Sequence, residues 1–261
     1  MTPVLVTGGT GRLGPALVDR LVGSGRPVRV VSRRPGPPRP AVEYARADLR
    51  SGVGVDAAVA GVEVVVHCAT TNGRGDVELM RSLVSAAVRA GHPHVVYVSI
   101  VGVDLIALSY YRAKLAAERL LAASGLPWTV LRATQFHALV AQLFDLQHRS
   151  PVLVVPAGVR VQPVDERDVA GRLAELAAGP AAGRVANLGG PEIHTLRELA
   201  AMYAHARGLR RAVLPVPLPG AVARRYRDGG NLAPEQADGP TTFAEYLLAR
   251  GYYSGLRAEP R

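Results

Sequence analysis

The chain has 261 residues, of which 48% are hydrophobic, and it carries a formal net charge of +10. This length and apolar content indicate a globular protein with one large domain, or one domain with a small appendage. The positive charge comes from arginines spread between Arg12 and Arg261 rather than gathered in a block, which argues against direct nucleic-acid binding.

Targeting signals are absent from the sequence as it stands. The apolar run at residues 4–6 follows Met1 almost at once, so we expect no signal peptide, and no apolar run approaches the length of a membrane span. Cys68 is the only cysteine, which excludes an internal disulfide. These features predict a cytoplasmic protein without a membrane partner.

Short apolar runs alternate with amphipathic segments along most of the chain. We expect strands at residues 4–6, 27–31, 62–67, 94–99, 128–131 and 184–188. Segments 76–90 and 110–123 are long enough to be helical crossovers between parallel strands. The alternation predicts an α/β fold with a doubly wound parallel sheet of the Rossmann type.

The sequence also suggests how the chain is divided. We expect a dinucleotide-binding domain at residues 1–190, with residues 133–163 contributing to a substrate pocket, and a small substrate-binding cap at residues 191–261. Thr195 and Glu198 match a capping box for a helix that runs through Ala206. Asp165 and Asp168 open another helix, and we interpret them as capping residues rather than as a catalytic carboxylate pair.

A glycine-rich loop follows the first expected strand. Gly9, Gly11 and Gly14 fit G-x-G-x-x-G, and Gly8, Gly11 and Gly14 fit G-x-x-G-x-x-G. Glycines at these spacings permit a tight turn and a close backbone approach to a pyrophosphate at a helix N-terminus. Because the loop lies between a strand and a helix, the pattern favours dinucleotide binding over a merely structural turn.

The end of the second expected strand bears on the choice of dinucleotide. An acidic residue there would bind the ribose hydroxyls of NAD, but the strand ends in Ser32 and Arg33. The Arg33 guanidinium, helped by Ser32 and Arg12, can neutralise a ribose 2′-phosphate. We therefore expect NADPH, with NADP preferred over NAD; the alternative is an exposed arginine without a ligand.

Lys114 is the only lysine among 31 Lys and Arg residues. Tyr110, Lys114 and Glu118 are spaced by four, so they share one face of the helix expected at residues 110–123. An ammonium near the Tyr110 phenol would lower its pKa and suit it to proton transfer, and it can also hydrogen-bond ribose hydroxyls. Tyr111 is a second candidate acid, and the alternative is a surface Lys114 paired with Glu118.

The chain resembles the short-chain dehydrogenase/reductase superfamily, and within it the atypical, NmrA-like branch related to the extended members. The resemblance extends over nearly the whole chain. It is carried by residues 7–14 (TGGTGRLG), 47–49 (ADL), the Tyr110-x-x-x-Lys114 pair, 164–170 (VDERDVA) and 188–192 (LGGPE).

The resemblance implies a role for several further residues. The pyrophosphate would be held by Thr10, Gly11, Arg12 and Leu13, the adenine would be bordered by Asp48 and Leu49, and Ala69 would lie along the cofactor. Tyr110 would be the proton donor and Lys114 its partner. Ser99 would polarise the substrate carbonyl, unless the register places that position at Val101. Gln135, Phe136 and His137 would face the substrate, with His137 equally open to a packed or solvated role.

The leading hypothesis is an NADPH-dependent reductase that acts on a mainly apolar or aromatic small molecule. A sugar-nucleotide epimerase or dehydratase is one alternative, for which the cluster Arg207, Arg210, Arg211, Arg224, Arg225 and Arg227 would bind a diphosphate. An NmrA-like redox sensor without chemistry is another. The histidines lack metal-ligand spacing, so we expect no metal; monomer and dimer both stay open.

Overall fold

The computed structural model describes residues 2–252 of the 261-residue chain. The described chain forms two compact units. The first contains the residues up to Ala133 together with Val169–Ala186, and the second contains Thr134–Asp168 together with the described residues from Asn187 onward. The sequence analysis expects the boundary between the two domains at residue 190, whereas in the structure segment 134–168 also belongs to the second unit. Each unit is described by itself below.

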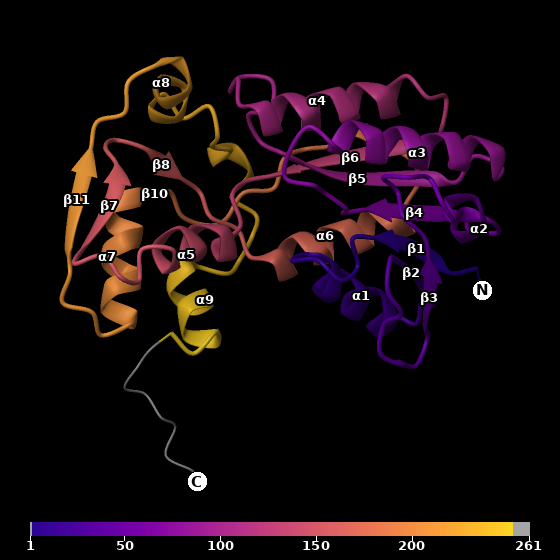
Figure 1. The fold of residues 1–261 in the computed structure, drawn as a ribbon, viewed down its shortest axis with the longest axis horizontal. Coiled ribbons are helices and arrows are strands. Elements are labelled where there is room, and N and C mark those ends of the chain that lie inside the picture. Colours follow the sequence, from indigo (N-terminus) through magenta and orange to yellow (C-terminus); the bar gives the residue numbers. More distant parts are fainter. Residues whose placement is uncertain (1, 253–261) are drawn as a thin grey trace, which may run out of the picture. The chain divides into compact units, whose positions relative to one another are not determined.

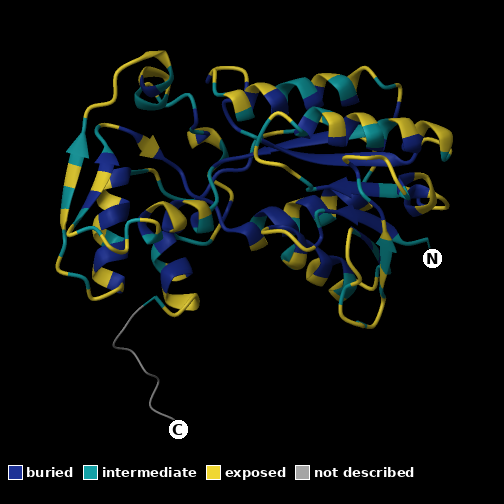
Figure 2. Ribbon diagram, viewed as in Figure 1, coloured by how far each residue is buried: buried dark blue, intermediate teal, exposed yellow. Residues whose placement is uncertain are grey.

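The first unit contains a seven-stranded parallel sheet with the strand order β3-β2-β1-β4-β5-β6-β9. Its strands are β1 (Val4–Thr7), β2 (Val28–Ser32), β3 (Val42–Arg46), β4 (Val64–His67), β5 (His94–Ile100), β6 (Trp128–Ala133) and β9 (Gly183–Arg184). The central strands are almost wholly buried, as their blue colour in Figure 2 shows. Buried Val and Leu runs of this kind suit a parallel sheet covered on both faces. The expected Rossmann-like α/β fold is confirmed.

Helices cover both faces of this sheet (Figure 1). They are α1 (Gly14–Gly23), α2 (Val55–Val59), α3 (Asp76–Arg89), α4 (Ser109–Ala122) and α6 (Glu166–Ala178). Helices α3 and α4 lie on one face and α1 and α6 on the other. The apolar stripe of α3, with Leu79, Met80 and Leu83, packs on the buried side chains of β4 and β5. This packing fixes where α3 and α4 begin, next to the carboxyl ends of the strands.

The second unit has its own core and two short sheets. Strand β7 (Val152–Pro156) pairs in parallel with β11 (Ala212–Val216), and β8 (Arg160–Val161) pairs antiparallel with β10 (His194–Thr195). The helical elements are α5 (His137–Asp145), α7 (Leu196–Ala206), α8 (Ala221–Arg227), the 3₁₀ turn η1 (Pro234–Gln236) and α9 (Phe243–Ala249). Phe144, Tyr203 and Phe243 are buried in one hydrophobic core of this unit.

The expected helix ends agree closely with the structure. Thr195 Oγ1 accepts a hydrogen bond from the Glu198 backbone N–H, and the Glu198 carboxylate accepts one from the Thr195 N–H, so the capping box of α7 is present. Asp165 Oδ1 accepts from Arg167 N at 2.7 Å at the start of α6. Asp168 instead accepts from the backbone and hydroxyl of Thr241. Asp165 therefore caps α6 as the sequence predicts, whereas Asp168 lies in the first turn of α6 and binds Thr241 instead.

The last expected strand is much shorter than the sequence predicts. Residues 184–188 form an apolar run, but β9 is only Gly183–Arg184 at the sheet edge. Val185 N still donates to Val130 O, after which the chain enters the second unit at Asn187. The ladder stops there because the chain leaves the sheet, which an apolar pattern does not reveal.

Candidate functional site

The glycine loop is shaped by close backbone contacts. Gly8 has φ +71, and a Cβ at this position would lie 2.6 Å from Ala69 N. A Cβ on Gly14 would lie 2.2 Å from Gly8 O, because α1 begins directly against the loop. Only glycine fits at either position. The loop therefore leaves a cradle of bare backbone at the carboxyl end of β1, where a side chain would otherwise stand.

The rest of the loop opens toward solvent. Thr10, Gly11 and Arg12 are exposed, while Leu13 is buried and anchors the turn to the core. Helix α1 has no side-chain cap at its first turn, so its leading N–H groups can donate hydrogen bonds to an anion. The residues expected at a pyrophosphate thus lie in one exposed turn before an uncapped helix N-terminus.

Below the loop, a buried contact joins the ends of β1 and β4. Thr7 Oγ1 lies 2.6 Å from His67 Nδ1, and Ala69 N donates to Thr7 Oγ1 at 3.4 Å. Burial lowers the pKa of His67 to about 3, so His67 is neutral at pH 7 and shares one hydrogen bond with the Thr7 hydroxyl through Nδ1. This contact fixes Ala69, the residue expected along a cofactor, directly beside Gly8.

The residues expected near the adenosine end lie on β2 and after β3. Arg33 is exposed just beyond β2, and Ser32 Oγ accepts from Arg34 N at 3.2 Å. Asp48 Oδ1 accepts from Arg50 N at 2.9 Å, which makes a tight turn of that loop, and Leu49 is buried. The end of β2 therefore presents a hydroxyl and a guanidinium but no carboxylate of its own.

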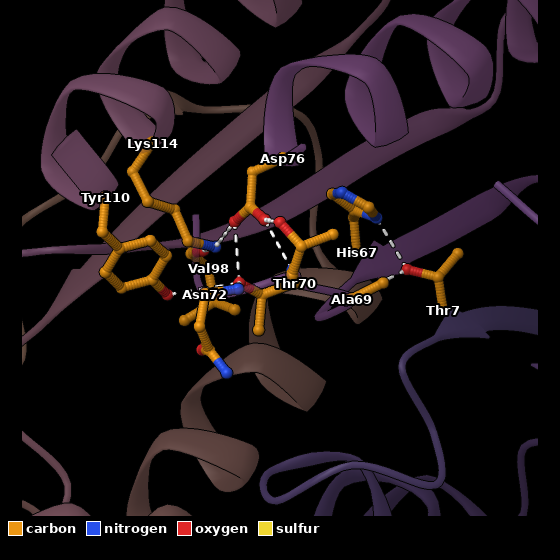
Figure 3. A network of polar contacts seen from close by, with 10 residues as sticks. Thr7, His67, Ala69, Thr70, Asn72, Asp76, Val98, Tyr110 and Lys114 are labelled. Atoms are coloured by element: carbon orange, nitrogen blue, oxygen red, sulfur yellow. Dashed lines mark hydrogen bonds and ion pairs between the residues drawn. The ribbon is translucent and has the colours of Figure 1, made fainter. Parts of the chain in front are cut away.

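Lys114 is buried, with 3% of its surface exposed. Its Nζ lies 3.5 Å from Asp76 Oδ2, donates to Val98 O at 3.4 Å, and stands 4.8 Å from the centroid of the Tyr97 ring. The centroid of the Tyr110 ring is 5.9 Å away. Figure 3 shows these groups converging from α3, α4 and β5. The alternative of a surface lysine paired with Glu118 is therefore wrong.

Glu118 instead pairs with Arg132, in a cluster that also includes Asp104. Arg132 donates to both carboxylate oxygens of Glu118, at 2.9 and 2.7 Å, and to Asp104 Oδ2 at 2.8 Å. A planar guanidinium suits this forked contact. The cluster ties α4 to β6 and leaves Lys114 to a different carboxylate.

Asp76 is the residue of this region that the sequence did not single out. It is 1% exposed and opens α3. It accepts hydrogen bonds from the hydroxyls of Thr70 and Thr71, both at 2.8 Å, and from Thr71 N at 2.6 Å. Thr70 Oγ1 also lies 3.4 Å from the Tyr110 hydroxyl. The group Thr70, Asp76, Tyr110 and Lys114 is called the polar cluster below.

The pKa of Tyr110 is raised, not lowered as the sequence predicts. Burial raises the pKa of Tyr110, the charge of Asp76 raises it further, and only the Thr70 hydrogen bond opposes them. Asp76 lies 3.5 Å from the Lys114 ammonium, so a negative charge accompanies the positive one in this cluster. Tyr110 is thus a protonated phenol at neutral pH.

The remaining candidates from the same strand and helix are more enclosed. Ser99 lies on β5 and is 3% exposed, and its Oγ has no hydrogen-bond partner among the described residues. Val101 follows β5 and is also buried. Tyr111 is 5% exposed, whereas Tyr110 is half-buried and points into the polar cluster. Of the two tyrosines, Tyr110 is the one that Figure 3 places beside Thr70 and Lys114.

The substrate-side candidates belong to the second unit. His137 is 1% exposed, pairs through Nε2 with Thr241 O at 2.9 Å, and packs against the rings of Phe243 and Tyr246. This environment favours the packed role left open for His137. Gln135 exchanges side-chain contacts with Asn231, and Phe136 is half-buried at the start of α5.

Several arginines of the late cluster have structural partners. Arg211 donates to the carbonyls of Gln147 and His148, and Arg227 donates to Leu218 O. Arg207 stacks over the Tyr252 ring. These contacts occupy three of the six side chains within the second unit, so the cluster is not one open anion site.

Comparison with known proteins agrees with this geometry. The NAD(P)H-binding family model matches residues 8–178, more than half of the chain, so the chain belongs to this NAD(P)H-binding family. Structural neighbours at 19–22% identity share its Rossmann-like fold.

Three solved structures illustrate the shared fold. An NADPH-dependent quinone oxidoreductase of Escherichia coli, complexed with NADPH, has a TM-score of 0.81 at 21% identity and covers 95% of this chain and 99% of its own. A nucleoside-diphosphate-sugar epimerase of Staphylococcus aureus has a TM-score of 0.80 at 19% identity, covering 94% and 99%. A short-chain dehydrogenase/reductase protein of Agrobacterium tumefaciens with bound NAD has a TM-score of 0.72 at 22% identity, covering 95% of each.

Curated relatives are longer than this chain. An uncharacterized protein of Mycobacterium tuberculosis is 29% identical over 83% of this chain, which spans 24% of that protein. The rice divinyl chlorophyllide a 8-vinyl-reductase is 28% identical over 73% of this chain, which spans 55% of it. The chain therefore corresponds to a part of each relative.

The described residues hold neither a metal-ligand cluster nor a membrane-spanning helix. Among residues 2–252, no group of three or more His, Cys, Asp or Glu side chains is placed to hold a metal ion. Within the same described range, every helix is too short or too polar to cross a membrane.

Proposed function

We propose that the protein is an NADPH-dependent reductase that transfers a hydride to a carbonyl or conjugated small molecule, such as a ketone, enone or quinone, with Tyr110 as the proton donor. The observation that carries this proposal is the polar cluster, in which the Tyr110 hydroxyl lies 3.4 Å from Thr70 Oγ1 and the Lys114 ammonium lies 5.9 Å from the centroid of the Tyr110 ring. The carboxyl end of β4 leads through Ala69 to Gly8 of the glycine loop.

The chain's own residues fit a dinucleotide. A Cβ would fill the cradle at Gly8 and Gly14, so the glycines keep open a space that a pyrophosphate can use. Thr10 to Leu13 would hold the pyrophosphate before the uncapped start of α1. Asp48 and Leu49 would border the adenine.

The preference for NADPH rests on Ser32 and Arg33. A guanidinium at the end of β2, without a neighbouring carboxylate from that strand, favours a 2′-phosphate over free ribose hydroxyls. Arg12 lies in the exposed turn of the glycine loop and would add a second positive charge. The NADPH named with the quinone oxidoreductase supports this choice, while the NAD named with another neighbour supports the opposite one.

Proton transfer follows from the state of Tyr110. When bound, the reduced nicotinamide supplies the hydride. Because burial raises its pKa, Tyr110 is a phenol that can donate a proton to the substrate oxygen, which suits reduction better than oxidation. Lys114 has three N–H donors, of which Asp76 and Val98 take two, so one is left for a ribose hydroxyl.

The substrate is proposed to be a mainly apolar or aromatic small molecule. Within the second unit, Phe136 is half-buried and Leu139 is 53% exposed near Gln135, which gives that segment apolar surface. Ser99 would polarise the carbonyl only if its buried Oγ reached the substrate. Thr70 is exposed and its Oγ1 lies 3.4 Å from the Tyr110 hydroxyl, so it is the more accessible hydroxyl beside Tyr110.

The experiment is NADPH oxidation over a panel of ketones, enones and quinones, measured with the wild type and Tyr110→Phe. We expect Tyr110→Phe to keep NADPH binding and to lose most of the turnover, by about 10²- to 10⁴-fold. Tyr111→Phe is the matched control, because it removes the neighbouring phenol from the same helix turn.

Equal turnover by the wild type and Tyr110→Phe would remove Tyr110 from the mechanism. A sugar-nucleotide product formed without net NADPH consumption would favour the epimerase, which several neighbours are named as. Tight NADPH binding with no turnover of any substrate by either protein would favour the redox sensor.

A further inference from the structure

We propose that Asp76 is the positioning residue of the polar cluster: it holds the ammonium of Lys114 and, through the Thr70 hydroxyl, orients the phenol of Tyr110 (Figure 3). This inference rests on the proposed function of Tyr110 and Lys114. Neither the matched family nor the resemblance assigns a role to Asp76.

The carboxylate of Asp76 is held from several sides. It is 1% exposed, yet two hydroxyls, one backbone N–H and one ammonium surround its two oxygens. A buried charge with this many donors stays in one place, because moving it would break several hydrogen bonds at once. Asp76 is therefore a rigid anchor at the start of α3.

Lys114 depends on this anchor for its charge. Asp76 lies 3.5 Å from Nζ, while the other neighbours are a backbone carbonyl and the face of the Tyr97 ring. The titratable groups facing Lys114 are Asp76, Cys68, Glu118, His67, Tyr97 and Tyr110. Glu118 is occupied by Arg132, and His67 is neutral. Asp76 is thus the carboxylate that keeps the buried ammonium charged.

Thr70 connects the anchor to the proton donor. Its hydroxyl lies 2.8 Å from Asp76 Oδ2 and 3.4 Å from the Tyr110 oxygen. The hydroxyl has one proton, which goes to the carboxylate while Tyr110 is a phenol. When the Tyr110 O–H bond breaks and its proton goes to the substrate oxygen, the Thr70 O–H can rotate toward the new phenolate. Asp76 keeps its Thr71 and Lys114 partners during this exchange.

The uniqueness of Lys114 makes a direct test available. Protein produced with ¹³C,¹⁵N-lysine gives a single side-chain signal, because the chain contains one lysine. Its NMR titration reports the Lys114 pKa without cofactor, substrate or turnover. We expect the pKa of Lys114 to lie below its usual value because of burial, and to fall by at least about one further unit in Asp76→Asn, which removes the opposing charge.

Glu78→Gln is the matched control for charge. Glu78 lies in the same first turn of α3 as Asp76 but is exposed. The Glu78→Gln substitution removes one negative charge from that turn. We expect the Lys114 pKa to stay within about 0.2 units of the wild-type value, because water screens an exposed charge. Equal Lys114 pKa values in folded Asp76→Asn and wild type would overturn the proposal.

A second pair of variants covers the case in which Asp76→Asn does not fold. Thr70→Val and Thr71→Val each remove one exposed hydroxyl that donates to Asp76 at 2.8 Å, but only Thr70 lies beside Tyr110. In ¹³Cζ-tyrosine spectra, with Tyr110 assigned by its loss in Tyr110→Phe, we expect Thr70→Val alone to raise the Tyr110 pKa. Equal Tyr110 pKa values in both valine variants would overturn the proposal. Since these titrations need no substrate, their failure is distinct from a failure of the reductase assignment.

Discussion

Lys114 and Arg132 show at the scale of single residues why the chain keeps one lysine. Arg132 uses a flat fork to grip both oxygens of Glu118, which a guanidinium does well. Lys114 must instead fit one compact charge over the Tyr97 ring and between Asp76 and Val98 O. A guanidinium is larger and planar, so it would displace one of these partners. The lysine is therefore explained by its buried surroundings before any catalytic role is added.

Arg33 and Arg34 provide the residue-scale test of cofactor choice. Both are exposed after β2, but the proposal assigns the 2′-phosphate to Arg33 alone. We expect Arg33→Ala to weaken NADPH binding by about 10- to 100-fold, the loss of one or two charge-assisted hydrogen bonds, and to leave NADH binding nearly unchanged. Fluorescence titration with both dinucleotides measures this, and Arg34→Ala is the control. Equal losses for NADPH and NADH would contradict the 2′-phosphate assignment.

At the scale of elements, the approach of α1 to the glycine loop is the closest contact of the proposed cofactor site. The Gly14 position has no room for a Cβ, which would lie 2.2 Å from Gly8 O and 2.4 Å from Gly9 Cα. These are backbone atoms and cannot rotate away. Because Gly14 has no side chain, the helix can lie directly against the loop, with its N-terminal N–H groups directed at the space above the glycines.

Gly14→Ala and Gly23→Ala compare the two ends of α1. We expect Gly14→Ala to push the helix off the loop, to destabilise the protein by about 1–3 kcal/mol and to weaken dinucleotide binding at least about tenfold. Gly23 is the last residue of α1, with no atom within 4 Å of an added Cβ, so Gly23→Ala should be neutral or stabilising by up to about 1 kcal/mol. Thermal unfolding and NADPH titration of both variants check this, and an unperturbed Gly14→Ala would show that α1 can shift at no cost.

The same elements show how far sequence reasoning reaches. Helices α3 and α4 and strands β1, β2, β4, β5 and β6 follow the apolar periodicity within a few residues, because a two-sided core imposes a regular pattern. Strand β3 was not among the expected strands, because none of its residues is fully buried and its sequence has no continuous apolar run. Tyr110 and Lys114 were found because they share a helix face. Asp76 and Thr70 were not, because they act across a loop and a helix start, and nothing in the spacing distinguishes the buried Asp76 from the exposed Glu78. The partner of Lys114 is a tertiary contact, which periodicity cannot report.

At the scale of the whole molecule, buried histidines make the free energy of unfolding depend on pH. His67 has a pKa lowered to about 3 by burial, and burial also lowers the pKa of His94 and His137. An unfolded histidine titrates near pKa 6.5. Above pH 6.5 these side chains are neutral in both states and do not affect the free energy of unfolding. Below it, the unfolded chain gains protons that the folded protein does not bind, so stability falls.

His67→Asn tests this linkage. From pH 6.5 down toward pH 3, His67 alone should lower the free energy of unfolding by about 1.4 kcal/mol per pH unit. Asparagine cannot titrate but can still hydrogen-bond the Thr7 hydroxyl, so the variant should unfold with a shallower dependence on pH, whatever its stability at pH 7. Urea unfolding at pH 7, 6 and 5 gives the slopes, with His148→Asn as an exposed control that should keep the wild-type slope. Equal slopes for wild type and His67→Asn would mean that His67 takes up a proton in the folded protein, and that the contact joining β1 to β4 beneath the glycine loop opens in mild acid.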